Sequence, residues 1–380
     1  MYHRLPYIDQ WCDSQFSAHL ELLKTLAAIP APSHQEHRRA EFIRDWLEKN
    51  CGVRPMLDGA LNVILPVGDD GITPFRVLMA HTDVVFPDTD PLPVREENGI
   101  LYAPGAGDDT TNVAALMLCA KYLTAHNIRP EMPLLIVFNS CEEGLGNLKG
   151  VRQIMSDYHG RVQELVSFDL GFDWLVERAV GSIRWEVRVS TEGGHSFGDF
   201  GKPNAIARLS ELICDLYRQR IPWKENTTTT FNVGTIQGGT SINTIAQEAA
   251  MTYECRSDDR DCLEIMKRQF LDCVNNAFKP GVTLKTTEIG TRPCGDSVIT
   301  QEQHTLLNRC EHAIVSVTGE KPRRCSASTD ANIPLSLGIP AATFGLYRGG
   351  GAHTREEYVE ISSLTAGLKI ALRFLLEHPA

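Results

Sequence analysis

Short, largely apolar runs and amphipathic stretches alternate along most of this chain. Phe75–Ala80, Leu134–Phe138, Leu165–Phe168 and Ala341–Phe344 have the length and composition of buried strands. Thr110–His126 instead carries its apolar residues at helical spacing, which predicts a long helix. Strands that alternate with helices in this way predict an α/β fold, in which helices cover a large sheet.

A different pattern occupies the middle of the chain, beginning near Gly181. Ile183, Trp185, Val187 and Val189 alternate with charged residues, which is typical of a strand with one exposed face. A helix, two strands, a helix and a strand are expected next, at residues 204–219, 229–237, 244–256, 258–276 and 282–289. The resulting order, β-α-β-β-α-β, is the ferredoxin-like arrangement. We therefore predict that a small domain, residues 180–290, is inserted into a discontinuous larger domain formed by residues 1–179 and 291–380.

Size, charge and cysteine content narrow the class of protein. With 380 residues the chain exceeds what one core usually covers, which agrees with two domains. The formal net charge of −11 argues against nucleic-acid binding. The first residues lack the apolar stretch of a signal peptide, and no apolar run is long enough to span a membrane, so we expect no membrane association. Eleven cysteines without a Cys-x-x-Cys pair indicate reduced thiols, hence a cytoplasmic protein in which Cys141 is buried and inert.

Side chains of the kinds that bind metals stand just past the ends of the apolar runs. They are His81 and Asp83 after the first run, Glu142 and Glu143 after the second, Asp169 after the third and His353 beyond the fourth, with Asp108 ahead of the long helix. Ligands of open α/β sheets bind outside the carboxyl ends of the strands, so these side chains are expected to converge on one crevice. Nitrogen and oxygen ligands of this kind fit zinc best.

The number of candidate ligands indicates two metal ions. These side chains come from five separate places in the chain, which gives five ligands if each place supplies one. A catalytic zinc usually has three protein ligands and a water, so five ligands suit two ions that share one carboxylate. Two ions roughly 3.5–4 Å apart polarise a carbonyl and hold a hydroxide between them. The reaction also needs a base that moves a proton from the attacking water to the leaving amine. Glu142 and Glu143 are adjacent residues that leave a strand in different directions, so one can bind metal while the other faces the water.

Five motifs together resemble the di-zinc exopeptidase family that includes aminoacylase, carboxypeptidase G, peptidase T, the bacterial dipeptidases and succinyl-diaminopimelate desuccinylase. In chain order they are His81-Thr82-Asp83, Gly107-Asp108-Asp109, Glu142-Glu143-Gly144, Asp169 and Ala352-His353-Thr354. The similarity covers nearly the whole chain, including the position of the insert. It implies a three-layer α/β/α catalytic domain on a mixed sheet, with an inserted ferredoxin-like βαββαβ domain for the lid and for dimerisation.

The resemblance also implies a role for each residue. Asp108 would bridge two Zn²⁺ ions, for which Co²⁺ or Mn²⁺ can substitute, and its peptide bond to Asp109 would be cis. The other ligands would be His81 and Asp169 on one ion, and Glu143 and His353 on the other. Asp83 would orient the His81 imidazole, and Glu142 would be the general base.

The inserted domain contributes further candidates. His195 resembles the family's lid-loop histidine, which stabilises an oxyanion and often reaches across a dimer interface, although a histidine in a glycine-rich loop is usually a surface residue. Asn243 and Arg256 resemble substrate-binding residues, and Arg256 is suited to bidentate pairing with a substrate carboxylate. An ion pair of Arg256 with Asp258 or Asp259 is the structural alternative.

A homodimer through the inserted domain is a further expectation. We expect the strand Gly181–Thr191 to lie at an edge of its sheet, where it could pair with its counterpart in a second copy.

Together these residues favour hydrolysis of an amide bond in a small peptide, of aminopeptidase or dipeptidase type, by a hydroxide held between two zinc ions. Asp rather than Glu at position 169 makes the chain similar to the aminopeptidase and dipeptidase members. A deacylase of N-acyl amino acids, or a carboxypeptidase of the same family, is the nearest alternative because it breaks the same bond. An inactive metal-binding relative is more remote, since Glu142 and all five ligands are present. Thr110 and Ala246 replace the Lys and Pro that the family commonly has, which leaves the subgroup open.

Overall fold

The computed structural model of the protein describes residues 5–295 and 299–376. The chain groups into two compact units, of which the first comprises Met1–Ala179 and Val298–Ala380 and the second Val180–Ser297. The second unit therefore extends past residue 290, where the sequence pattern ended the inserted domain. The difference arises because strand β14 (Val282–Arg292) stays paired with the sheet of the second unit up to its last residue.

An eight-stranded mixed sheet forms the centre of the first unit. In spatial order its strands are β1 (Met56–Leu57), β2 (Val63–Val67), β6 (Leu134–Asn139), β3 (Phe75–His81), β7 (Val162–Phe168), β16 (Ala341–Phe344), β8 (Trp174–Ala179) and β15 (Arg323–Ala327). β3 is parallel to β6 and β7, and β16 is parallel to β7, so the carboxyl ends of these four strands lie along one edge. β3, β6 and β16 are buried at every position, which explains their continuous apolar runs.

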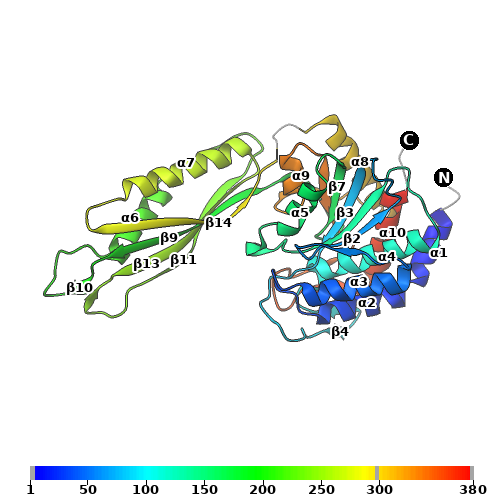
Figure 1. Ribbon diagram of the computed structural model, residues 1–380, viewed down its shortest axis with the longest axis horizontal. Coiled ribbons are helices and arrows are strands. Elements are labelled where there is room, and N and C mark those ends of the chain that lie inside the picture. Colours follow the sequence, from blue (N-terminus) through cyan, green and yellow to red (C-terminus); the bar gives the residue numbers. More distant parts are fainter. Residues whose placement is uncertain (1–4, 296–298, 377–380) are drawn as a thin grey trace. The chain divides into compact units, whose positions relative to one another are not determined.

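Helices cover both faces of this sheet (Figure 1), which confirms the three-layer α/β/α architecture. Successive residues of β3 point to opposite faces, so Leu78 and Ala80 join one core while Val77 and Met79 join the other. The larger core is completed by α1 (Leu5–Ser14), α2 (Phe16–Ala28), α3 (His37–Cys51), α4 (Asn112–Ala125), α8 (Gln301–Thr318) and α10 (Leu364–Leu376). The smaller core is completed by α5 (Lys149–Asp157) and α9 (Asn332–Ser336).

A second, small sheet in the same unit joins two segments that lie about 250 positions apart in the sequence. Its strands, in spatial order, are β17 (Gly349–Gly350), β18 (Tyr358–Glu360), β5 (Ile100–Tyr102) and β4 (Arg95–Glu97). His353 lies in the connection between β17 and β18, and Asp108 lies a few residues after β5. The pairing of β18 with β5 therefore brings the segments that carry these two side chains together.

The second unit is a ferredoxin-like domain. Its antiparallel sheet has the order β11 (Thr229–Gly238), β13 (Glu248–Ser257), β9 (Gly181–Thr191) and β14. Helices α6 (Ala205–Tyr217) and α7 (Arg260–Asn276) complete its core, where Trp185 stacks on Phe270 with 4.2 Å between ring centroids. Two short strands, β10 (Gly194–His195) and β12 (Thr244–Ile245), pair with each other.

The expectation that Gly181–Thr191 forms an edge strand is wrong. This strand, β9, pairs with β13 on one side and with β14 on the other. Each β-α-β crossover of the domain skips one strand position, which places β9 and β13 in the middle of the sheet. The edges are β11 and β14.

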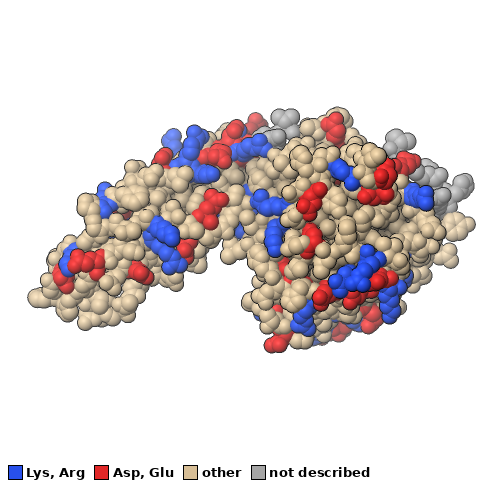
Figure 2. Space-filling model, in the orientation of Figure 1, with Lys and Arg blue, Asp and Glu red and all other residues tan. Residues whose placement is uncertain are grey.

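The cysteines, the helices and the surface charges can be compared with what the composition indicated. All eleven cysteines lie among the described residues and are free thiols. Cys141 is fully buried, and this burial raises the pKa of its thiol to about 12, so the reactive thiolate is disfavoured. Within residues 5–295 and 299–376, no helix has the length and apolar character needed to cross a membrane. Figure 2 shows Lys and Arg interspersed with Asp and Glu on the visible face of each unit.

Candidate metal centre

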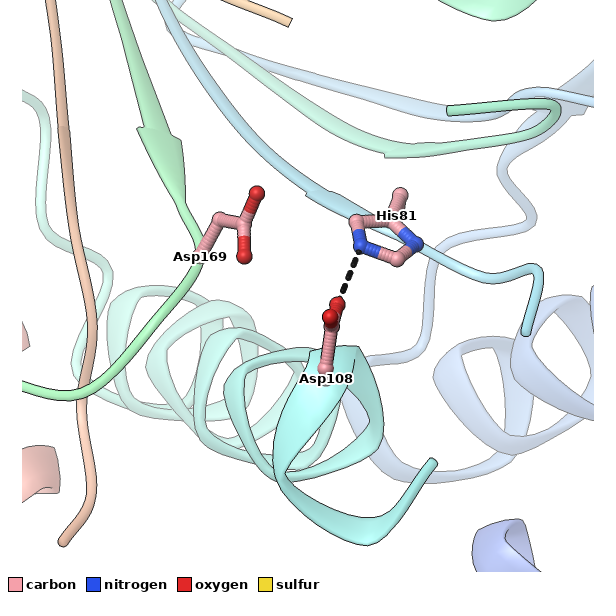
Figure 3. Close-up of side chains that lie close together, drawn as sticks. All are labelled: His81, Asp108 and Asp169. Carbon is pink, nitrogen blue, oxygen red and sulfur yellow. Dashed lines mark hydrogen bonds and ion pairs between the residues drawn. The ribbon is translucent and has the colours of Figure 1, made fainter. Parts of the chain in front are cut away.

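Acidic and imidazole side chains meet at the carboxyl edge of the large sheet. His81 is the last residue of β3, and Asp169 directly follows β7. Together with Asp108 they form a group whose ligand atoms all lie within 4.8 Å of one another. Figure 3 shows the Asp169 and Asp108 carboxylates beside the His81 ring. The strand-end positions recognised in the sequence therefore do converge.

Asp108 lies between two histidines. Its Oδ1 is 3.0 Å from Nε2 of His81, and its Oδ2 is 3.2 Å from Nε2 of His353. The same His353 nitrogen is 3.2 Å from Oε1 of Glu143. Asp108, Glu143 and His353 thus form a second group of ligand atoms within 4.8 Å. One carboxylate faces both groups, as a ligand shared by two metal ions must.

The neighbouring aspartate has a different environment. Asp109 accepts the backbone N–H of His81 at 2.8 Å and the side-chain amide of Asn112 at 2.5 Å. The peptide bond between Asp108 and Asp109 is cis, as the resemblance implied. Of the two aspartates, Asp108 is therefore the one that faces the histidines.

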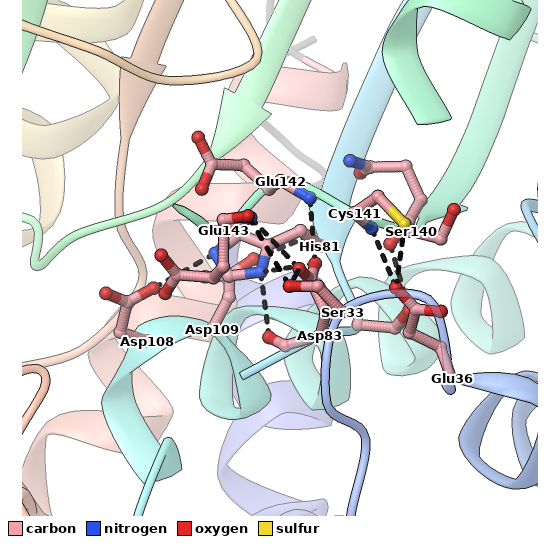
Figure 4. A network of polar contacts seen from close by, with 12 residues as sticks. Ser33, Glu36, His81, Asp83, Asp108, Asp109, Ser140, Cys141, Glu142 and Glu143 are labelled. Carbon is pink, nitrogen blue, oxygen red and sulfur yellow. Dashed lines mark hydrogen bonds and ion pairs between the residues drawn. The ribbon is translucent and has the colours of Figure 1, made fainter. Parts of the chain in front are cut away.

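Asp83 organises the site from behind His81 (Figure 4). Nδ1 of His81 is 3.1 Å from the carbonyl oxygen of Asp83 and 3.4 Å from its Oδ1. The Asp83 carboxylate also accepts the backbone N–H groups of Glu142 and Glu143, each at 2.9 Å, and the Ser33 hydroxyl at 2.6 Å. Asp83 thereby fixes both the imidazole, with Nε2 turned toward the ligand group, and the turn that carries the two glutamates.

The two glutamates differ in their neighbours. Glu142 and Glu143 leave the turn in different directions (Figure 4), and each has an oxygen within 4.8 Å of a His81 nitrogen. His81, Glu142 and Glu143 thus form a third group of ligand atoms within 4.8 Å. Glu143 is also a member of the group with Asp108 and His353, whereas Glu142 occurs in this third group alone among the groups found in the described residues. This difference favours Glu143 as the ligand and places Glu142 beside the ligands.

Glu357 is a buried carboxylate that the sequence analysis missed. Its Oε1 accepts the N–H groups of Gly107 at 2.8 Å and Asp108 at 2.7 Å, and its Oε2 accepts that of Gly105 at 2.9 Å. The carboxylate shapes the loop that presents Asp108 and ties it to the segment that carries His353. A glutamate in a charged stretch has the sequence pattern of an exposed turn, so its position shortly after His353 was the only signal.

The electrostatics of the site favour a cation. Burial, followed by the charge of Asp108, raises the pKa of Glu143 to about 7 and that of Asp169 well above its ordinary value. Burial also opposes ionisation of Asp108, but hydrogen bonds from His353 and His81 lower its pKa. Hydrogen bonds to Asp108 and Glu143 raise the pKa of His353 to about 11. Buried carboxylates that repel one another beside imidazole nitrogens fit divalent ions that accept both oxygen and nitrogen.

His195 lies in the second unit, in an exposed loop at β10. Its Nδ1 accepts the backbone N–H groups of Phe197 at 3.3 Å and Gly198 at 3.4 Å, which leaves Nε2 as the ring nitrogen that donates. Asn243 is close by, because its backbone carbonyl oxygen accepts the backbone N–H of Ser196 at 3.0 Å. The structure thus brings His195 and Asn243 together within this unit.

Arg256 is not part of that pair. It lies near the far end of β13, in register with Ser182, whereas the first residue of that strand pairs with Ser190 close to the His195 loop. Its guanidinium binds Glu254 through two hydrogen bonds of 3.0 and 3.1 Å. The ion pair that we considered with an aspartate is therefore formed with a glutamate instead.

Comparisons with known proteins agree with this geometry. A sequence profile described as peptidase family M20/M25/M40 matches residues 77–377. The chain is 25% identical over 372 residues to succinyl-diaminopimelate desuccinylase of Corynebacterium glutamicum, covering 94% of this chain and 95% of that protein. It is 26% identical over 305 residues to acetylornithine deacetylase of Myxococcus xanthus, covering 76% of each.

Solved structures resemble the fold over nearly its whole length. A tripeptidase of Staphylococcus aureus has a TM-score of 0.76 at 18% identity, covering 95% of this chain and 97% of that one. A dipeptidase of Saccharomyces cerevisiae has a TM-score of 0.75 at 18% identity, covering 99% of this chain and 98% of that one. At this level of identity the similarity establishes the architecture and does not identify the substrate.

Proposed function

Because this chain belongs to peptidase family M20/M25/M40, we propose that it is a di-zinc hydrolase of small peptides, of the aminopeptidase or dipeptidase type. Family membership makes the protein a hydrolase of peptide or acyl-amino acid bonds that uses divalent metal ions. The number of ions, their identity as zinc and the preference for peptides are our proposals. The observation that carries them is the position of Asp108, with one carboxylate oxygen facing His81 and the other facing His353.

The ligand assignment follows from the two groups of side chains. We propose that His81 and Asp169 hold one ion and that Glu143 and His353 hold the other, with Asp108 shared between them. Two divalent ions bound there would polarise the scissile carbonyl and make a water nucleophilic at neutral pH. Co²⁺ or Mn²⁺ is expected to replace Zn²⁺, because the same oxygen and nitrogen ligands accept these ions.

The remaining steps use side chains of the protein. Glu142 would take a proton on its carboxylate from the attacking water as the water oxygen bonds to the carbonyl carbon. It would then pass that proton to the nitrogen of the leaving amine as the C–N bond breaks. Asp83 supports this step in two ways, since it fixes the turn that carries Glu142 and keeps Nε2 of His81 directed at the ligand group.

Residues of the second unit are proposed to contact the substrate. His195 would donate its Nε2–H to the oxyanion that forms at the carbonyl carbon. Asn243 would hydrogen-bond the substrate, and Arg256 would exchange its partner Glu254 for a substrate carboxylate. We also propose that the enzyme is cytoplasmic and forms a homodimer through this unit, for which the edge strands β11 and β14 are the available pairing surfaces.

N-acyl amino acids are a second candidate class of substrate. The two sequence relatives described above are by name a desuccinylase and a deacetylase, and the same chemistry would cleave either bond. A carboxypeptidase activity would also fit the site. An assay must therefore compare the turnover of substrates with a free amine and of substrates whose amine carries an acyl group.

The test is a metal-reconstitution assay on paired substrates. The protein is stripped with a chelator, reloaded with Zn²⁺, Co²⁺ or Mn²⁺, and assayed on free-amine dipeptides and tripeptides and on the N-acetyl and N-succinyl forms of the same amino acids. We expect metal-dependent turnover with the higher kcat/KM on free-amine peptides. Preference for acylated substrates would make the protein a deacylase. Absence of turnover with every metal on the whole panel would instead indicate an inactive, metal-binding relative.

A further inference from the structure

Glu36 is a buried glutamate whose carboxylate reaches the turn that carries Glu142 and Glu143. We propose that Glu36 is a positioning residue for Glu142, and that it acts by accepting the backbone N–H of Cys141 through one carboxylate oxygen. This inference rests on the proposed function, in which Glu142 is the general base. All of these Glu36 contacts lie within the first unit.

The position of Glu36 in the chain makes its orientation informative. It is the N-cap residue of α3, a position at which the shorter side chains of Ser, Thr, Asp and Asn are the usual acceptors of helix N–H groups. The Glu36 side chain forms no such bond. It is fully buried and turned instead toward Cys141, which lies 105 positions later in the sequence. The side chain therefore holds a distant turn and leaves its own helix uncapped.

Only one of the two carboxylate oxygens makes these contacts. Oε1 accepts the backbone N–H of Cys141 at 3.0 Å and the Cys141 thiol at 3.1 Å (Figure 4). It also accepts the backbone N–H of His34 at 3.0 Å. Oε2 is buried and has no hydrogen-bond partner in the described part of the chain. The turn at Cys141 therefore requires an acceptor oxygen at the position of Oε1, and it does not require Oε2.

The turn needs such support because Cys141 has an unfavourable backbone conformation. Its φ of 57° lies in the left-handed region, which is uncommon for residues other than glycine. Three successive N–H groups are held by carboxylate oxygens: that of Cys141 by Glu36, and those of Glu142 and Glu143 by Asp83. Loss of the Glu36 contact would let the Cys141 peptide rotate. Since this peptide immediately precedes Glu142, its rotation would redirect the Glu142 side chain.

The thiol is not the functional partner in this arrangement. Sγ of Cys141 is 3.4 Å from Nδ1 of His34, so a Cys-His-Glu set is present in outline. Cys141 is fully buried, however, which keeps its Sγ out of contact with a substrate. The backbone N–H remains as the group through which Glu36 can influence catalysis.

A pair of substitutions separates the reach of the side chain from its charge. Glu36→Gln removes the charge but keeps an acceptor oxygen at the position of Oε1, with the amide NH₂ at the position of the unpartnered Oε2. Glu36→Asp keeps the charge but withdraws the carboxylate by one methylene, out of reach of the Cys141 N–H. Cys141→Ala removes the thiol and keeps the backbone N–H. Gln35→Ala, at an exposed neighbour of Glu36, is the matched control.

Each variant is assayed as the full-length, zinc-loaded protein for kcat, KM and zinc per chain. We expect Glu36→Gln, Cys141→Ala and Gln35→Ala to keep at least a third of the wild-type kcat. Glu36→Asp should lose at least tenfold in kcat, with KM and zinc content within twofold of wild type. A purely structural role would lower the zinc content or the yield of folded protein, and would not produce this split between kcat and KM.

Several results would overturn the proposal. These are a Glu36→Gln variant no more active than Glu36→Asp, a loss of zinc that parallels the loss of activity, a misfolded Glu36→Asp protein, or a Cys141→Ala loss as large as that of Glu36→Asp. A Glu142→Ala variant measured alongside distinguishes the two levels of inference. If it keeps wild-type activity, the proposed role of Glu142 fails. If it is inactive while Glu36→Asp is fully active, only the role of Glu36 fails.

Discussion

Removal of the metal ions should make the stability of the protein depend on pH in an unusual direction. Burial, followed by the charge of Asp108, raises the pKa of the Glu143 carboxyl from 4.5 to about 7 in the metal-free protein. The folded state then binds a proton over a pH range in which the unfolded chain has released it. Stability from this group is fully present below pH 4.5 and is lost as the pH rises to about 7.

The size of the effect follows from the same values. The gap between 4.5 and about 7 corresponds to about 3 kcal/mol of free energy of unfolding for a side chain as buried as Glu143. His353 acts in the same direction, because its folded-state pKa of about 11 means that it keeps a proton that the unfolded chain releases above pH 6.5. For a unit of this size, about 3 kcal/mol lowers Tm by roughly 5–10 °C.

Thermal unfolding from pH 5 to pH 8 tests this reasoning. We expect the Tm of the chelated protein to fall by at least roughly 5–10 °C over this range. The zinc-loaded protein should show no such fall, because metal ions bind the deprotonated ligands and bind them more tightly as the pH rises. A chelated protein whose Tm is constant or rises from pH 5 to pH 8 would refute the electrostatic reasoning.

Two substitutions test whether the Glu143 carboxyl contributes to the fall of Tm with rising pH. Glu143→Gln should make the fall of Tm with pH measurably shallower in the chelated protein, whereas Glu41→Gln, at an exposed position of α3, should leave it unchanged. A residual slope is expected from Asp330 and Glu357, because burial raises the pKa of each carboxyl to about 7. An unchanged slope in Glu143→Gln would assign the effect to other residues.

Four further substitutions test individual assignments. Glu142→Ala should lower kcat by at least about 100-fold, as expected for loss of a general base, with both metals still found by elemental analysis; near-normal turnover would remove Glu142 from that role. His353→Ala should reduce the zinc content by one ion per chain, and an unchanged content would contradict its assignment as a ligand. His195→Ala should lower kcat by roughly 100-fold with the metal content unchanged, because an oxyanion donor is lost; unaffected kinetics would make the loop a plain surface feature. Glu357→Ala should weaken metal binding by roughly 10–100-fold in a chelator competition, while Glu356→Ala, at the exposed neighbouring position, should have no effect. Equal metal affinity of the two variants would show that the loop of Asp108 does not need the Glu357 carboxylate.

The fold and the cluster of candidate ligands were predictable from sequence for one physical reason. Parallel strands that are buried on both faces are continuous apolar runs, and their carboxyl ends lie along one edge of the sheet. His81, Asp169 and the pair Glu142 and Glu143 follow such runs directly, so their convergence could be inferred without coordinates. His353 follows its run at a distance, and the small sheet that places its segment was not foreseen.

The supporting carboxylates could not be predicted in the same way. Glu357 and Glu36 bind backbone N–H groups that lie 249 and 105 positions away, and a backbone N–H has no sequence signature. Each glutamate is flanked by polar or charged residues, which is the usual pattern of a solvated segment. The strand order of the second unit was misjudged for a related reason, because alternation shows which residues of β9 face the core but not which strands flank it.

These supporting carboxylates share a feature that bears on why the site selects cations. Asp83, Glu357 and Glu36 all bind backbone N–H groups, which hold a carboxylate in place without cancelling its charge. The buried cation Arg39 donates to the carbonyl oxygens of Thr82 and Ile29, at 2.9 and 2.6 Å. The geometry of the site is thus built largely from hydrogen bonds to the backbone. The charge of Arg39 acts on Asp83, Asp109 and Glu36, and the remaining negative charge of the site is left to be balanced by bound metal ions.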